Sequence, residues 1–180
     1  RIPAFTELIG IERDLLRQGH LPSPLGVGST WDSSSARFLP AALHIQGGRG
    51  RIWEALDREL NRTVAIKDLL PGHADNFSHH QRFLREAQIT GMLEHSGIVP
   101  VYGQGVAPDG RPFYAMRFIH GESFRDAIRR FHQEHGAAAF SANASRALRQ
   151  MLNRFIAVCS TIEYAHSRRV IHRDLKPENI

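Results

Sequence analysis

The sequence of 180 residues is poor in cysteine and contains no long apolar run. Its single cysteine, Cys159, excludes a disulfide framework and a cysteine-based metal site, and it is compatible with a reducing compartment. No stretch of eighteen apolar residues occurs, so the sequence predicts no transmembrane helix, and no charged-then-apolar leader opens it. We therefore expect a cytoplasmic chain, either free or as the cytoplasmic part of a larger, membrane-anchored protein.

Lysine is equally scarce, because 21 of the 23 basic residues are arginine and only Lys67 and Lys176 are lysine. An ammonium is a compact point charge whereas a guanidinium is a wide planar fork, so the two are not interchangeable beside a phosphate. Both lysines lie in segments that can handle phosphate, as described below. The net charge of +5 is scattered without a basic stripe interleaved with aromatic residues, so no nucleic-acid partner is predicted.

Residues 172–179 read HRDLKPEN and bring an aspartate, a lysine and an asparagine within six positions. Asp174 can accept a proton from an attacking hydroxyl, Lys176 can neutralise a phosphoryl group, and Asn179 can offer an oxygen to Mg2+. The segment resembles the catalytic loop of the protein kinases, H-R-D-x-x-x-x-N. In having a lysine two residues after the aspartate, the segment resembles the serine/threonine branch of that family.

A glycine-rich turn and the sequence Val-Ala-Ile-Lys that ends at Lys67 resemble the nucleotide-covering hairpin of the same family. Glycines suit such a turn because backbone N–H groups can approach an anion closely where no Cβ intervenes. The family's first glycine is replaced here by Ile45, whereas Gly47, Gly50 and the following apolar Ile52 match its pattern.

Hydrophobic periodicity predicts the elements around these motifs. Expected strands cover residues 41–45, 51–56, 63–67, 97–103, 111–119 and, briefly, 170–171. Expected helices cover residues 78–92, 123–132 and 145–166, besides a short one within residues 1–19. Ser78 and Gln81 suggest a capping box, residues 20–36 a linker, and residues 133–144 a loop insertion.

The resemblance implies an α+β, protein-kinase-like two-lobe fold. Its small lobe would be an antiparallel sheet with one helix, and its helical large lobe would be incomplete. Residues 1–36 would form a flank, and residues 37–180 a kinase domain that stops after the catalytic loop. Within that domain, residues 37–119 would be the small lobe and hinge, and residues 120–180 the start of the large lobe.

The resemblance also implies a site for ATP and Mg2+. Lys67, paired with Glu86 of the following helix, would orient the phosphates, Asp174 and Lys176 would be catalytic, and Asn179 would bind the metal. The residues expected to contact the nucleotide are Ile45, Gly47, Gly48, Gly50, Ile52, Ala65, Lys67, the gatekeeper Met116, Arg117 and Ile119 of the hinge, and Ser123.

The function that follows is transfer of the ATP γ-phosphate to serine and threonine hydroxyls of protein substrates. A pseudokinase that binds nucleotide or partners is the alternative, although Lys67, Glu86, Asp174 and Asn179 occur together. A small-molecule kinase of the aminoglycoside or choline type is disfavoured by the Leu-Lys-Pro-Glu continuation, and the oligomeric state is not predicted. Because the family's second metal-binding aspartate is not in this sequence, we expect the 180 residues alone to be inactive. We also expect poor solubility, because the last helix has one apolar face.

Overall fold

The structure, a computed structural model, describes residues 37–46, 50–74, 77–136 and 142–180, which fall into two compact units. The sheet unit comprises the described residues from Arg37 to Met92 together with Pro100–Ile119. The helical unit comprises Leu93–Val99 and the described residues of His120–Ile180. The flank predicted for residues 1–36 lies outside the described residues.

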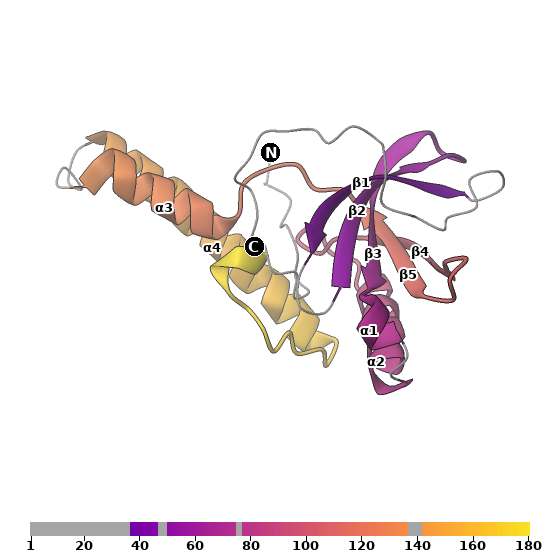
Figure 1. Cartoon of the computed structure of the whole chain (residues 1–180). Coiled ribbons are helices and arrows are strands. Elements are labelled where there is room, and N and C mark those ends of the chain that lie inside the picture. The colour runs from indigo at the N-terminus through magenta and orange to yellow at the C-terminus, as the bar shows by residue number, and fades with distance from the viewer. Residues whose placement is uncertain (1–36, 47–49, 75–76, 137–141) are drawn as a thin grey trace. The chain divides into compact units, whose positions relative to one another are not determined.

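Five antiparallel strands form the sheet, in the order β1-β2-β3-β5-β4 (Figure 1). Their bounds are β1 Phe38–Gln46, β2 Gly50–Asp57, β3 Arg62–Leu69, β4 Val101–Val106 and β5 Pro112–Arg117. All five were expected from the sequence. Residues 97–100, however, precede β4 rather than belong to it, and residues 118–119 follow β5.

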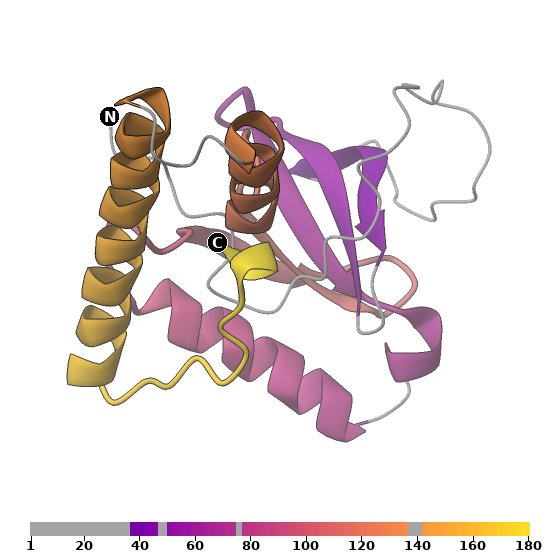
Figure 2. The ribbon, with the colours of Figure 1, turned by 90° about the vertical axis from the view of Figure 1, so that its left-hand side faces the viewer.

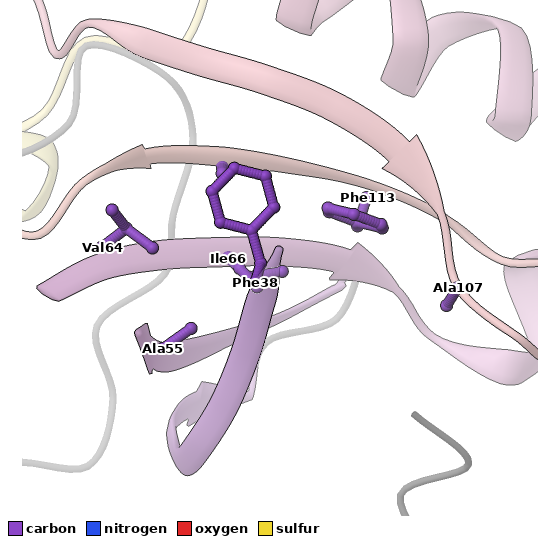
Figure 3. Packing of buried hydrophobic residues seen from close by; sticks show 7 residues of the cluster. Phe38, Ala55, Val64, Ile66, Ala107 and Phe113 are labelled. Carbon is purple, nitrogen blue, oxygen red and sulfur yellow. The ribbon is translucent and has the colours of Figure 1, made fainter. Parts of the chain in front are cut away.

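One face of the sheet carries an apolar cluster (Figure 3). Phe38 and Phe113 meet edge to face with ring centroids 6.1 Å apart, and Val64 and Ile66 beside them are fully buried. Burying each such aliphatic side chain contributes about 1.5–3 kcal/mol to the free energy of unfolding. The other members are Ala55, Ala107 and Ala115, with Trp53 and Tyr102 partly buried against them.

Helix α2, Phe77–Gly91, packs against β4 and β5 and follows the short helix α1, Pro71–Ala74. Its buried residues, Phe83, Ala87 and Thr90, recur at helical spacing and face the sheet. The predicted capping box is wrong, because the helix already includes Phe77 and Ser78 therefore lies in its first turn rather than at its N-cap.

The helical unit consists of α3 (Phe124–His135), α4 (Ala142–Ser167) and the 3-10 turn η2 (Pro177–Asn179). Helix α3 packs against α4, and η2 packs against α3. In Figure 2 the yellow segment after α4 turns back toward the start of α3, where the Phe124 N–H donates to the Ile180 carbonyl at 2.7 Å. Residues 93–99 join this unit through Tyr164, whose hydroxyl accepts the Glu94 N–H and whose ring stacks on His95.

Two expectations about this unit need correction. Helix α3 continues to His135 and α4 begins at Ala142, so the predicted loop insertion at 133–144 is partly helical, and its residues 137–141 lie outside the described chain. The predicted strand at residues 170–171 is wrong. Arg169 is left-handed, with φ 60°, and the Val170 N–H donates to the Ala165 carbonyl at 2.9 Å, so it closes the end of α4 and cannot join a strand ladder. In the part of the chain that is described, no helix is both long and apolar enough to cross a membrane.

Candidate active site

Five of the residues expected around a nucleotide lie in two neighbouring rows of paired residues that run across the strands of the sheet. Strand register makes Ile52 the partner of both Ile45 and Lys67, and it places Ala65 opposite Met116 one row away. Directly paired residues, and residues two apart along a strand, share one face of a sheet. The fold therefore brings these five residues, drawn from four strands, onto the same face.

Lys67 and Glu86 form an ion pair at the centre of that face, as the resemblance implied. Lys67 Nζ lies 2.7 Å from Glu86 Oε1, and the lysine side chain is only 9% exposed. The contact joins β3 to α2, because Glu86 lies one turn beyond Phe83 on the buried side of the helix. A buried ammonium needs such a partner, since an unpaired charge in this position would be strongly destabilising.

Of the predicted glycine-rich turn, residues 47–49 lie outside the described chain, and Gly50 begins β2. A Cβ added at Gly50 would lie 2.6 Å from the backbone oxygen of Asp68 on β3. Glycine is therefore required here by the close approach of two strands. Gly47 and Gly48 remain predictions.

The predicted hinge follows β5. Met116 and Arg117 end the strand, and the Arg117 N–H donates to the Pro100 carbonyl at 3.1 Å. Phe118 packs edge to face on His44 of β1, with ring centroids 5.1 Å apart. Ile119 is half-buried.

Asp174, Lys176 and Asn179 are drawn together in the loop after α4. Asn179 donates from Nδ2 to the Asp174 carbonyl at 2.8 Å and to Asp174 Oδ2 at 3.3 Å. Lys176 Nζ lies 3.5 Å from the same Oδ2, and the Asp174 side chain is 49% exposed. The arrangement leaves an accessible carboxylate held beside an ammonium, which can accept a proton and stabilise negative charge.

The start of α3 holds the end of this loop in place. Arg125 Nη1 lies 3.3 Å from Glu178 Oε1, a contact that the sequence did not predict. Ser123 is the N-cap of α3: its hydroxyl accepts the Asp126 N–H at 3.1 Å and donates to Asp126 Oδ2 at 2.6 Å. A nucleotide contact by Ser123 stays a prediction.

Two buried aspartates form ion-pair networks within the sheet unit. Hydrogen bonds from Arg37 lower the pKa of Asp57 to about 2, with Arg62 acting in the same direction and burial opposing both. Burial raises the pKa of Asp68 although Arg51 counteracts it. Neither network was predicted, because a charged residue within a strand reads in sequence as solvent-facing.

Comparison with known proteins decides the family. A family profile described as protein kinase domain matches residues 46–180. The chain belongs to the protein kinase family.

Two relatives of this kinase chain, both from bacteria, illustrate the similarity. The serine/threonine-protein kinase PknD of Chlamydia trachomatis (serovar D) is 38% identical over 136 residues, which are 75% of this chain and 14% of that protein. A relative of the same name from Chlamydia pneumoniae is 37% identical over the same shares of both chains. The kinase chain thus spans only about a seventh of the length of these relatives.

Solved structures agree on the fold. The apo form of PpkA-294 superposes with a TM-score of 0.63 at 20% identity, covering 91% of this chain and 57% of that one. The kinase domain of Mycobacterium tuberculosis PknI superposes with a TM-score of 0.58 at 23% identity, covering 86% and 56%. They confirm the α+β kinase fold predicted from the sequence. Members of this family generally use ATP and Mg2+ and act on proteins.

Tyr114 contacts the Lys67–Glu86 ion pair directly and was also missed by sequence reasoning. It lies opposite Lys67 in the register of β3 and β5, and its hydroxyl donates to Glu86 Oε1 at 2.9 Å. The only signal in the sequence was its position two residues before the expected gatekeeper Met116, which places both side chains on one face of a strand.

Proposed function

We propose that the chain is the nucleotide-binding and catalytic-loop part of a serine/threonine protein kinase. The observation that carries the proposal is the loop geometry, in which Asn179 holds Asp174 while Lys176 lies 3.5 Å from the Asp174 carboxylate. A loop that served only as a scaffold would not need an accessible carboxylate, an ammonium and a carboxamide in one cluster.

Each of these groups has a task in phosphoryl transfer. The substrate serine or threonine oxygen forms a bond to the γ-phosphorus of ATP while the bond between that phosphorus and the bridging oxygen breaks, and ADP leaves. Asp174 orients the hydroxyl and accepts its proton. Lys176 stabilises the negative charge on the phosphoryl oxygens, and Lys67, held by Glu86, orients the α- and β-phosphates.

The residues present suit Mg2+ as well as ATP. Asn179 Oδ1 is buried, and no described residue donates a hydrogen bond to it. A carboxamide oxygen is a hard ligand of the kind that Mg2+ prefers, so Asn179 would hold the metal. Mg2+, when bound, supplies neutralising charge to the phosphates.

We further propose protein substrates with serine or threonine acceptors and a cytoplasmic location. Lys176, two residues after Asp174, supports the first proposal, since the resemblance associates it with the serine/threonine branch. Cys159 as the single cysteine supports the second.

The test uses the full-length protein, radiolabelled ATP and myelin basic protein as a generic acceptor. Asp174→Asn removes the proton acceptor, and we expect transfer to fall by about 10²- to 10⁴-fold. Lys67→Met should raise KM for ATP and lower kcat. Glu163→Gln, an exposed carboxylate of α4, is the matched control and should behave as wild type.

Phosphoamino-acid analysis of the product should show phosphoserine and phosphothreonine. Transfer that survives Asp174→Asn would overturn the catalytic assignment. Nucleotide binding without any transfer by the wild-type protein would favour the pseudokinase alternative, and phosphotyrosine as the product would overturn the serine/threonine assignment.

A further inference from the structure

The hydroxyl of Tyr114 makes a contact that the proposed function does not use. Tyr114 lies in β5, is 1% exposed, and its hydroxyl donates to Glu86 Oε1 at 2.9 Å. The Lys67 ammonium lies 5.7 Å from the centroid of the same ring, and the Phe83 ring of α2 packs on it with centroids 5.0 Å apart. One buried aromatic side chain therefore contacts both members of the ion pair and the helix that supplies one of them.

The ion pair by itself does not immobilise Glu86. Its side chain is 31% exposed, and partly exposed ion pairs are weak because solvent screens them and two flexible side chains must be ordered. Tyr114 differs from Lys67 because its short, rigid side chain is buried and its ring packs on Phe83. A second donor on the same oxygen restricts the rotamers of Glu86 to those that also meet Lys67.

The hydroxyl is needed for this contact and not for packing. Phenylalanine would fill the same space, and a buried hydroxyl without a partner would be costly. The ring packs on Phe83, and the charged groups of the ion pair lie beside the ring and its hydroxyl. The Glu86 carboxylate, which accepts the hydrogen bond, explains why the ring carries a hydroxyl.

We propose that Tyr114 is a positioning residue that holds Glu86, and through it Lys67 and α2, in the arrangement that binds the phosphates of ATP. The proposal rests on the proposed function for its kinetic consequence only. Its structural content, that Tyr114 ties α2 to the sheet through Glu86, can be tested without catalysis.

The central variant is Tyr114→Phe in the full-length protein, which removes one oxygen and keeps the ring. A hydrogen bond to a charged group is worth enough to predict about a tenfold fall in kcat/KM for ATP. We expect a similar loss of affinity for a fluorescent ATP analogue. Tyr102→Phe is the matched control, since the ring of Tyr102 lies under the Arg62 guanidinium at 3.6 Å, on β4 and away from the ion pair; it should change neither quantity.

A double-mutant cycle separates positioning from a general structural role. In a Glu86→Ala background, Tyr114→Phe should have no further effect on affinity for the ATP analogue, because the partner of its hydroxyl is already gone. Hydrogen exchange of the α2 amides should become faster in Tyr114→Phe and stay unchanged in Tyr102→Phe.

Three results would overturn the proposal: wild-type affinity in Tyr114→Phe, the same loss in the presence and absence of Glu86, or unchanged exchange in α2. Failure of the proposed function looks different. If Asp174→Asn keeps its transfer activity while the cycle between Tyr114 and Glu86 still shows coupling, the catalytic assignment falls and the positioning role stands.

Discussion

Replacing Arg51 with methionine tests whether a buried carboxylate ties three strands of the sheet together beside the site. Asp68 is fully buried on β3. It accepts two hydrogen bonds from Arg51, at 3.2 and 2.6 Å, one from Arg111 Nη1 at 2.7 Å and one from Trp53 Nε1 at 3.2 Å. These donors come from β2 and from the turn before β5, so the carboxylate links the strands where β2 begins.

The expected loss follows from the geometry. Removing one partner of a buried ion pair costs about 3–5 kcal/mol, because a charge is left without compensation. Arg111 and Trp53 remain on Asp68, and the Arg51 side chain is 16% exposed, so the lower end of that range applies. We therefore expect a loss of about 3 kcal/mol in the free energy of unfolding of the kinase domain.

Thermal and urea unfolding of the full-length protein at neutral pH provide the measurement. The matched control is Arg82→Met, the same substitution at an exposed position of α2, which should change the free energy of unfolding by less than about 0.5 kcal/mol. Hydrogen exchange should locate the loss in β2 and β3. If Arg51→Met and Arg82→Met had the same small effect, the buried carboxylate would not stabilise the sheet and the reasoning would be refuted.

Three further changes have defined outcomes. The folded-state pKa of Asp57 is lowered to about 2. The Asp57 carboxylate therefore stabilises the fold at pH values above the ordinary aspartate pKa, and this stabilisation is lost as the pH falls toward 2. Asp57→Asn should make the urea midpoint depend less on pH across that window. Gly50→Ala places a Cβ 2.6 Å from the backbone oxygen of Asp68, so we expect β2 and β3 to separate there and the affinity for a fluorescent ATP analogue to fall; a normal affinity would show that the two strands do not need to approach so closely. Leu152 and Ile156 of α4 are 51% and 63% exposed. The double substitution Leu152→Lys and Ile156→Lys should reduce self-association of the 180-residue chain in sedimentation velocity. Unchanged association would show that another surface mediates it.

The strands and the helices were largely predictable, because alternation and helical periodicity are local properties of the sequence. The wrong predictions of secondary structure occur where residues outside the local pattern determine the conformation. Val170 reads as part of a strand, yet its N–H closes the end of α4. Ser78 reads as an N-cap, yet the helix begins before it.

Residues with a motif could be named from the sequence, whereas residues that act only through contacts could not. Lys67 and Glu86 could be named because their spacing matches the kinase family, and the structure brings them to 2.7 Å. Tyr114 and Asp68 carry no motif, so their contacts with Glu86 and with Arg51 became visible only in three dimensions.

The sequence by itself determined the family, the order of the elements and the chemical groups of the loop at residues 172–179, because each depends on residue types at short, regular spacings. Tertiary structure alone decided which charges are buried and which donors share an acceptor. Such choices depend on strand register and on the packing of α2 against β4 and β5, which bring together residues 19 to 43 positions apart in the chain.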